Sequence, residues 1–409
     1  MNTMTSSRLK GENSSSVQLK NRSLILNIIR SEGITTQTDL VKFTGLNKAT
    51  ISLIINEFKQ QGIIEEKGYV DGNNGRRLIG IGLVESNLYS IVIRINTSYL
   101  AIGLFDESSK FIIAKKEFLD TQEDLNKTFQ KICEEIDLLL PYIQERTLLG
   151  IGVAVEGHFY IRGNRYVIPI TPESSDLFDI GRELEKKYTV PILVNGARNF
   201  HSYYYWSKYE KDKIGHSAIL NINVSYTIEC GIMINGEIIL GACGLAGNIG
   251  ELITGHDEAG KRQTLNSILA STSIVEKASK MIPQYPASIL ASIEKINIRD
   301  VIAAYYKNDP IAHKLYDDGA KHLGVAIGIL INILNPSIIT FADELPNSSE
   351  FVNTVLDEVK QQVCPEVLNI TQIKLGDNMD VRQIQSDTSM MGTSMYVTDN
   401  AFNTLSFIK

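Results

Sequence analysis

Residues 45–64 constrain the fold of this chain more than any other stretch. Their apolar side chains recur at helical spacing, at Leu46, Ile51, Ile54, Ile55 and Phe58. Asn47 precedes this run and is a candidate helix cap. The opposite face of the same helix carries Ala49, Ser52, Leu53 and Asn56. We therefore predict a helix with one face in a core and the other face free to enter a groove.

Two shorter patterns precede this helix. Between residues 19 and 30, apolar side chains repeat with a helical period. Residues 36–39 (Thr-Gln-Thr-Asp) then form a capping box for a short second helix that stops at Gly45. Three helices with a short turn between the second and third form a helix-turn-helix, whose last helix reads the major groove of DNA.

A two-stranded ribbon is expected after the third helix. Residues 63–69 and 77–81 have strand character, and they flank the turn-rich residues 71–75. Arg76 and Arg77 lie next to this tip. The pattern is typical of a winged helix-turn-helix, with the wing placed to contact the DNA backbone or the minor groove.

The charge of the chain is unevenly distributed. The whole chain has a formal charge of −7, but residues 1–80 hold 11 Lys and Arg against 7 Asp and Glu, a net charge of +4. Residues 81–409 therefore carry −11. A basic head on an acidic body favours a nucleic-acid contact at one end only.

These patterns predict the residues that contact DNA. We expect the outward face and the start of the third helix, together with the start of the second helix, to contact base edges and nearby phosphates. The residues concerned are Thr36, Gln37, Asn47, Lys48, Ala49, Thr50, Ser52, Leu53 and Asn56. Arg76 and Arg77 are expected to contact the backbone or the minor groove. The alternative is that the three helices form a protein-interaction module.

Beyond residue 84 the pattern changes to alternating strands and helices. Predicted strands cover residues 90–95, 99–105, 111–118, 148–155, 191–194, 217–224, 338–341 and 373–375, with a hairpin at 231–240. Predicted helices cover residues 125–143, 200–210, 272–281, 298–306, 311–334 and 351–362, and residues 241–255 are expected to be glycine-rich loop. Two β-rich starts, each followed by helices, predict an α/β body of two similar lobes with a cleft between them.

An aromatic run at residues 203–206 is expected to pack inside the protein or to form a dimer surface. Stacking on a ligand is the alternative.

Composition narrows the class of protein. The four cysteines are scattered without any C-x-x-C pair, which argues against a disulfide framework or a thiolate metal site. The first 20 residues are polar and unlike a signal peptide. Residues 323–334 are too short to span a membrane and are expected to form a buried helix. We expect a cytoplasmic protein.

Several motifs resemble those of the ROK family of repressors, open reading frames and sugar kinases, in particular its repressor branch. In the head they are residues 21–22, 44–52 and 75–77. In the body they are residues 150–155, 241–250 and 334–336. The resemblance implies a winged helix-turn-helix followed by a two-lobed actin-like body, which is ribonuclease H-like and sugar-kinase-like. Enzymes of the family bind ATP and a hexose in the cleft.

The chain departs from the family pattern at the phosphate loops. The first loop of the enzymes carries an Asp and glycines, but here residues 94–98 read Arg-Ile-Asn-Thr-Ser. The second loop is rich in glycine in the enzymes, but here residues 225–229 read Ser-Tyr-Thr-Ile-Glu. Side chains would fill the phosphate space, and Glu229 would repel phosphate.

The catalytic base and the zinc ligands of the family are also replaced. Gly196 and Ala197 stand where the family has an Asn-Asp pair, and neither can accept a proton. Residues 259–266 lack the family's zinc-binding cysteines, and His256 with Asp257 falls short of the usual ligand number. The resemblance therefore implies no kinase activity and no metal or other cofactor.

Four residues at or near the family's sugar positions could still bind a small molecule, because amides both donate and accept hydrogen bonds. They are Asn199, Asn248, Glu251 and Asn266. The alternative is that the cleft is a packed interface between lobes and binds no ligand.

The sequence as a whole predicts a regulator of transcription, a repressor of carbohydrate-related genes. It is expected to bind operator DNA as a homodimer or tetramer, with a sugar or sugar derivative as possible effector. The expected domains are a tail (1–17), the winged helix-turn-helix (18–83), a first lobe (84–200, joined by 385–409) and a second lobe (201–384). The alternatives are a sugar kinase with an accessory head and a sensor that binds another protein.

Overall fold

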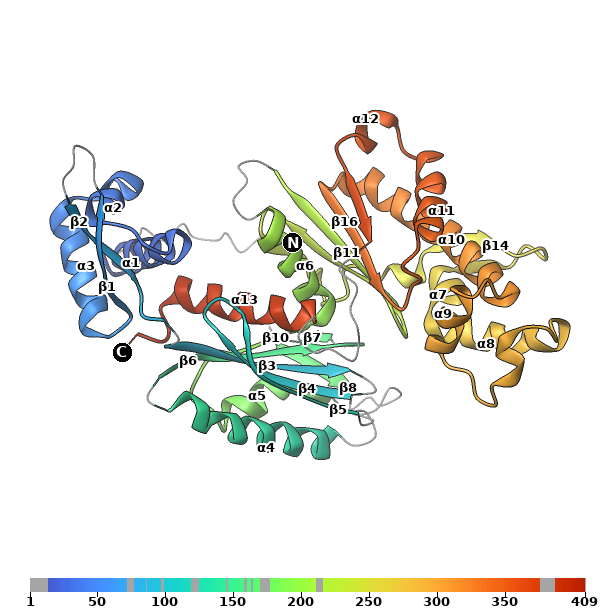
Figure 1. Ribbon diagram of the computed structural model, residues 1–409, viewed down its shortest axis with the longest axis horizontal. Helices are drawn as coiled ribbons and strands as arrows, with labels where there is room; N and C mark the ends of the chain where they lie inside the picture. Colours follow the sequence, from blue (N-terminus) through green and yellow to red (C-terminus); the bar gives the residue numbers. More distant parts are fainter. Residues whose placement is uncertain are drawn as a thin grey trace, which may run out of the picture.

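The computed structural model describes residues 14–71, 77–85, 87–96, 99–118, 125–144, 146–157, 160–162, 165–169, 177–210, 216–375 and 387–408. Figure 1 shows a small N-terminal head (blue), a first lobe below it and a second lobe (yellow to orange) on the far side. The winged helix-turn-helix followed by a two-lobed α/β body is confirmed.

The head consists of α1 (Ser14–Glu32), α2 (Gln37–Thr44), α3 (Lys48–Gln60), β1 (Ile64–Asp71) and β2 (Arg77–Leu83). Local capping sets the helix boundaries. The Thr36 hydroxyl accepts a hydrogen bond from the Asp39 amide at 3.2 Å, and Gly45 ends α2 in the left-handed region with φ 68°. Asn47 caps α3, since its Oδ1 accepts from the Thr50 amide at 2.8 Å. The strands pair antiparallel as the wing.

The first lobe is built on a sheet with the strand order β10-β6-β3-β4-β5. These strands are β3 (Leu88–Asn96), β4 (Tyr99–Asp106), β5 (Phe111–Phe118), β6 (Thr147–Val155) and β10 (Ile192–Gly196). On one face lie α4 (Leu125–Ile143) and α5 (Ile180–Glu185), and on the other lies α13 (Thr388–Thr404) (Figure 1). The short strands β7 (Tyr160–Arg162), β8 (Arg165–Pro169) and β9 (Leu177–Phe178) form a further ribbon.

The second lobe repeats the plan with the strand order β13-β12-β11-β16-β17. Its strands are β11 (Ala218–Val224), β12 (Ile228–Ile234), β13 (Glu237–Ile238), β16 (Ile338–Asp343) and β17 (Gln372–Leu375). Its helices are α7 (Leu265–Leu269), α8 (Ser271–Met281), α9 (Ile298–Tyr305), α10 (Pro310–Leu334), α11 (Ser349–Lys360) and α12 (Pro365–Leu368). Most of α10 is buried, as expected for residues 323–334. None of the described helices could cross a membrane.

Two helices join the lobes. Helix α6 (Ala197–Tyr209) packs on β11 and β12 of the second sheet, and α13 packs on β6 and β3 of the first. The two helices pack on each other so closely that a Cβ at Gly392 would lie 1.9 Å from the Phe200 carbonyl oxygen. The buried Tyr203 ring lies 5.1 Å from that of Tyr396 on α13. The internal packing expected for the aromatic run is therefore found, and α6 crosses the expected lobe boundary at residues 200–201.

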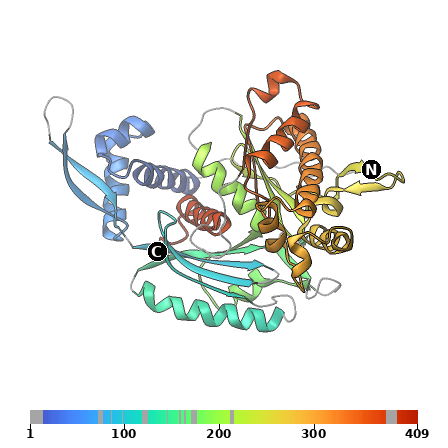
Figure 2. The same cartoon turned by 45° about the vertical axis from the view of Figure 1, so that its right-hand side comes forward.

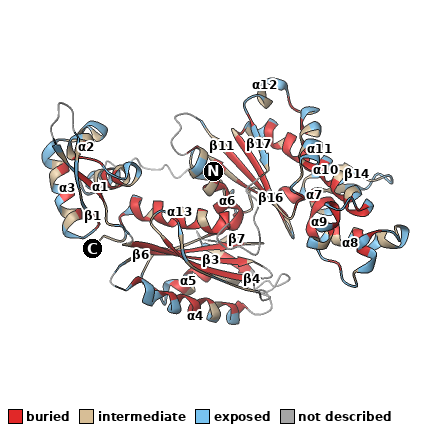
Figure 3. Ribbon diagram, in the orientation of Figure 1, coloured by how far each residue is buried: buried red, intermediate tan, exposed pale blue. Residues whose placement is uncertain are grey.

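The structure also contains elements that the sequence reading missed. Residues 241–255 are not all loop, because they include a 3-10 turn, η2 (Ile249–Glu251), and most of β14 (Ile253–His256), which pairs with β15 (Arg262–Thr264). The 3-10 turns η3 (Ile282–Gln284) and η4 (Ile289–Ser292) precede α9. Helix α13 was missed as a helix because α6, the first sheet and α1 surround it, so its buried residues show no amphipathic period (Figure 3).

Candidate nucleic-acid interface and ligand cleft

The two faces of α3 differ as the sequence predicted. Ile51, Ile54, Ile55 and Phe58 are buried in the core of the head. On the other face, Ala49 and Asn56 are exposed, and Leu53 is 71% exposed. The side chains of Lys48, Ser52 and Asn56 make no hydrogen bond or ion pair within the described part of the chain. These donors and acceptors are therefore available to an external partner.

Some of the residues predicted to contact DNA at the start of α2 and α3 also cap these helices. Thr36 is 4% exposed, and its hydroxyl both caps α2 and donates to Asp39 Oδ2 at 2.7 Å. Gln37 is half-buried. Asn47 uses Oδ1 for its capping bond and keeps its amide group exposed. The role of these three residues in DNA contact stays a prediction.

The wing extends away from the body, as Figure 2 shows. Its strand register runs from Ile64 opposite Leu83 to Asp71 opposite Arg77. Arg77 is exposed at the outer end of β2 and has no ion pair among the described residues. Lys67, by contrast, is bound to Glu65 at 2.7 Å and to Glu85 at 3.3 Å. Arg76 and the turn at residues 72–76 lie outside the described residues.

The head is joined to the body through α13. Arg30 of α1 forms an ion pair with Asp399 at 2.6 Å, and its guanidinium lies 4.9 Å from the centre of the Phe402 ring. Asp399 also accepts a hydrogen bond from the Tyr203 hydroxyl of α6 at 2.5 Å. The chain of contacts from Arg30 through Asp399 to Tyr203 therefore connects the head to the helix between the lobes.

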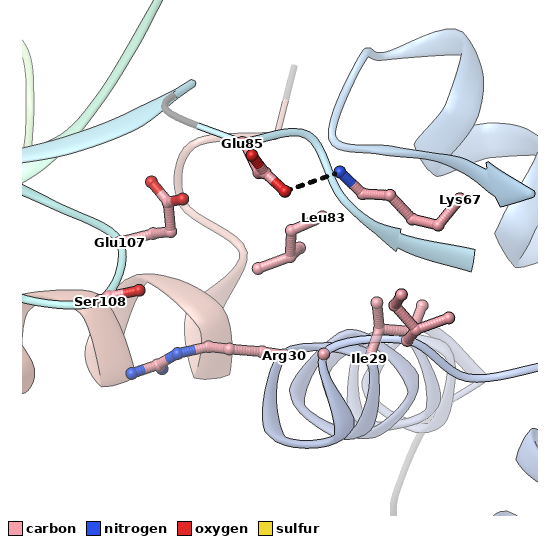
Figure 4. A pocket seen from close by; sticks show the side chains of 9 residues that line it. Ile29, Arg30, Lys67, Leu83, Glu85, Glu107 and Ser108 are labelled. Carbon is pink, nitrogen blue, oxygen red and sulfur yellow. Dashed lines mark hydrogen bonds and ion pairs between the residues drawn. The ribbon is translucent and has the colours of Figure 1, made fainter. Parts of the chain in front are cut away.

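A cavity of about 370 Å³ lies beside this joint (Figure 4). The head lines it with Ile29, Arg30, Lys67 and Leu83, and the turn after β4 lines it with Glu107 and Ser108. The head and the first lobe are thus in contact on one side of the joint and separated on the other.

Between the lobes, where the sequence predicts a cleft, lies an ion-pair cluster centred on Arg94. This residue is 4% exposed and projects from β3 toward the N-terminus of α13, where it binds Asp387. Its other terminal nitrogen binds Glu156 at 2.8 Å, which also accepts from Asn96 at 2.5 Å. The Ser225 hydroxyl of the second lobe donates to Glu156 at 3.1 Å. One cation thus pairs with two carboxylates, and the cluster spans both lobes.

The pKa values of two carboxylates in and beside the cluster shift in opposite directions. Burial alone would raise the pKa of Glu156, but the Arg94 charge and the hydrogen bonds outweigh it, so this pKa is lowered. Asp343, at the end of β16, accepts from the Asn223 amide at 2.5 Å. Burial raises the pKa of Asp343 to about 7, and Arg94 and Asn223 offset this only in part. Asp343 therefore titrates near neutral pH.

Residues 90–400 match the sequence profile of the ROK family, which is more than half of the chain. The chain belongs to the ROK family. Residues 19–65 match the profile of a winged helix-turn-helix DNA-binding domain.

Named ROK relatives align along most of their length. The xylose repressor of Bacillus subtilis is 22% identical over 379 residues, covering 88% of this chain and 93% of the relative. The transcriptional repressor Mlc of Escherichia coli is 22% identical over 364 residues, covering 85% and 87%. A solved ROK transcriptional regulator, described as a homologue of the Mlc protein, superposes with TM-score 0.79 and 18% identity over 96% of this chain and 99% of that one. A ROK hexokinase from Thermus thermophilus superposes with TM-score 0.57 and 16% identity, and the match covers 75% of this chain and 97% of the hexokinase chain.

The phosphate-loop positions of the ROK family carry bonded side chains in this chain. Arg94 and Asn96 of the first loop belong to the ion-pair cluster, and residues 97–98 lie outside the described residues. In the second loop, Ser225 bonds to Glu156. The expectation that Glu229 would repel phosphate needs correction, because its charge is neutralised by Arg198 at 2.9 Å.

Three of the four predicted ligand residues lie together. The Asn266 amide donates to Glu251 Oε1 at 3.1 Å, and Asn266 Oδ1 accepts from the Ile228 amide at 2.8 Å. Asn248 is exposed just before η2, the turn that contains Glu251. Asn199 lies apart on α6, where its amide donates to Asn195 at 2.7 Å and its Oδ1 is buried with no hydrogen bond among described residues. Whether the four bind a ligand stays a prediction.

The sequence reading missed several residues that shape the cleft. Arg198 binds the Gly244 carbonyl at 2.7 Å as well as Glu229, and so connects α6 to the glycine-rich loop. Glu156, 62 residues after Arg94, and Asp387, 293 residues after it, both bind the Arg94 guanidinium. A signal existed for Arg94, because a cation inside the apolar run of β3 requires a buried partner. The sequence alone does not identify that partner.

Proposed function

We propose that this protein is a sequence-specific DNA-binding repressor of transcription that acts in the cytoplasm. The observation that carries the proposal is the outward face of α3, where Lys48, Ser52 and Asn56 have no partners among the described residues and stand on a rigid, capped helix. Major-groove readers present donors and acceptors in this manner. The named repressors in the ROK family support the same role.

We further propose that the body does not transfer phosphate. Arg94 occupies the first phosphate-loop position with its charge neutralised by Asp387 and Glu156, and Gly196 with Ala197 supplies no base. The competing function is a sugar kinase with an accessory head. Turnover of ATP with any member of a hexose panel, in a coupled assay on the full chain, would establish that function instead.

The proposed role of the body is to control the head. A sugar or sugar derivative bound between the lobes, without a metal or other cofactor, would favour one lobe arrangement, which requires different affinity for the two arrangements. The contacts from Tyr203 through Asp399 to Arg30 would carry the change to α1. In a homodimer on a palindromic operator, this movement would alter the spacing of the two recognition helices.

The test is a selection experiment with the full chain. Sheared genomic DNA is incubated with the protein, and the bound fragments are sequenced; the expected result is a shared, roughly palindromic motif. On that motif, Asn56→Ala is expected to weaken binding by about 10-fold or more, because a base contact is lost. The matched variant Asn369→Ala, exposed on the second lobe, is expected to bind like the wild type. Bound fragments without any shared motif would contradict the proposal.

A thermal-shift screen of sugars and sugar phosphates tests the effector. A ligand present at 100 times its Kd stabilises the folded state by about 2.7 kcal/mol. A stoichiometric protein that co-purifies, with no stabilising sugar, would favour a body that senses a protein partner.

A further inference from the structure

Three helix ends meet at the edge of the second lobe, away from the cleft. Tyr305 is the last residue of α9, His313 and Asp317 lie one turn apart near the start of α10, and Glu350 lies in the first turn of α11. Residues four apart on a helix share one face, so His313 and Asp317 point the same way. The ligand atoms of His313, Asp317 and Glu350 all lie within 4.8 Å of one another.

No cation of the described part of the chain neutralises the two carboxylates of this group. Across the described residues, the side chains of Asp317 and Glu350 form no hydrogen bond and no ion pair. Burial raises the pKa of the neighbouring Tyr305, and the charges of Glu350 and Asp317 contribute to that rise. Two adjacent carboxylates without a cation repel each other, and a bound cation would remove that repulsion.

The imidazole is held in the manner of a metal ligand. His313 Nε2 lies 3.1 Å from the Tyr305 carbonyl oxygen, and this bond leaves Nδ1 unprotonated when Nε2 donates. The Tyr305 ring stacks on the imidazole at 4.2 Å with 18° between the planes, and its hydroxyl is 3.3 Å from Ser348 Oγ. Ser348 in turn caps α11. The supporting contacts therefore fix both the ring and the helix that carries Glu350.

We propose that His313, Asp317 and Glu350 form a binding site for a first-row divalent cation such as Zn²⁺. An imidazole nitrogen selects such ions over Mg²⁺ and Ca²⁺, which prefer oxygen ligands alone. Zinc bonds of about 2.1 Å place tetrahedral ligands about 3.4 Å apart. The exposed Glu350 side chain can rotate to close the remaining gap. Three protein ligands leave a coordination position for water, and the ion would tie α10 to α11.

The site is separate from the cleft and from the glycine-rich loop. None of its ligands belongs to residues 241–266, where His256 and Asp257 lie, and none contacts the head. The proposal therefore stands whether or not the protein binds DNA or a sugar.

Calorimetric titration of the untagged, chelator-treated full chain with Zn²⁺ tests the site. The wild type is expected to bind one equivalent that Mg²⁺ does not displace. His313→Gln and Asp317→Asn are each expected to weaken this binding at least about 10-fold. The matched control is Asp318→Asn, because Asp318 is the next residue of α10 and faces His322 instead, 3.9 Å away. It is expected to bind Zn²⁺ like the wild type.

The exposed thiols of Cys243 and Cys364 are the competing ligands. In a Cys243→Ser, Cys364→Ser background the Zn²⁺ affinity is expected to persist, and Co²⁺ is expected to give visible bands without thiolate charge transfer. Thermal unfolding monitors the fold of each variant in the absence of metal. Equal affinity of Asp317→Asn and Asp318→Asn, or loss of binding on removing the thiols, would overturn the proposal.

Discussion

The polar side chains of the recognition helix and those between the lobes differ in whether they bond within the protein. On α3, Lys48, Ser52 and Asn56 are left without partners among the described residues. In the cleft, Arg94, Asn96 and Glu156 bond to one another and to Asp387. An outward binding surface and an internal structural cluster therefore differ in where their hydrogen bonds are made. The outward face of α3 presents its polar groups to an external partner, whereas the side chains between the lobes bond within the protein.

The largest expected effect tests whether the cleft cluster is structural. Arg94→Ala removes the cation between Asp387 and Glu156 and leaves one buried and one half-buried carboxylate without a counter-charge. We expect it to lower the free energy of unfolding by about 3–5 kcal/mol, measured by urea denaturation. Arg77→Ala in the wing is the matched arginine control and is expected to change stability by less than about 0.5 kcal/mol. Equal losses of unfolding free energy in Arg94→Ala and Arg77→Ala would show that the cluster between the lobes is no more important for stability than the exposed wing.

The second prediction concerns pH and Asp343. Its pKa is about 7 in the folded protein and about 3.9 when unfolded, so the folded state binds an extra proton between these values. The stability that this proton contributes is complete below about pH 4 and is lost as the pH rises through 7. The contribution is up to about 4 kcal/mol, since each unit of pKa corresponds to about 1.4 kcal/mol.

Asp343→Asn measures this contribution. The free energy of unfolding is measured for both proteins at pH 5 and pH 8. The stability advantage of the wild type over the variant is expected to be smaller at pH 8, because only the wild type then buries a charged carboxylate at position 343. Because the charge of Glu344 contributes to the raised pKa of Asp343, both proteins also carry Glu344→Gln, which removes that group from the comparison. A difference independent of pH would show that Asp343 is already ionised at pH 5.

The joint between head and body gives the third prediction. A double-mutant cycle on Arg30→Gln and Asp399→Asn is expected to yield a coupling energy of about 1.5–3 kcal/mol, since both groups are charged and largely buried. The exposed pair Lys360–Asp357 is the control, with an expected coupling below about 0.5 kcal/mol. Coupling energies that match in the two pairs would mean that the joint is no firmer than a surface ion pair.

The smallest effect is expected in the wing. Arg77→Ala is expected to weaken binding to all DNA sequences alike and to reduce the slope of log affinity against log salt by about 1, because one phosphate contact is lost. Fluorescence anisotropy at several salt concentrations measures the slope, with Lys360→Ala as the control. An unchanged slope would remove Arg77 from the predicted DNA contacts.

Features that depend on neighbouring residues could be predicted from the sequence. Asn47 and Gly45 bound α2 and α3 because capping is decided within three or four residues. The Asn235-Gly236 turn was found for the same reason, with φ of 51° and 82°.

Features that depend on distant residues could not be predicted. Arg94 and Asp387 are 293 residues apart, and no spacing rule connects them. Helix α13 shows no amphipathic period because other elements cover it on several sides, so its helical state is visible only once those neighbours are in place. The sequence predicts departures from the family pattern at single positions such as Arg94 and Asn96, but the bonds that these side chains make are tertiary contacts.

The position of α13 has a consequence for synthesis of the protein. The core of the head includes Val397, Ala401 and Phe402 of this helix. Arg30 of the head pairs with Asp399, which lies 369 residues further along the chain. At about 5–20 residues per second, the ribosome needs roughly 20–70 s to supply that helix after α1 has been made. During that interval the nascent head lacks part of its core. A chain that ends at a premature stop codon before α13 would therefore keep the head but lack the Arg30–Asp399 ion pair between head and body.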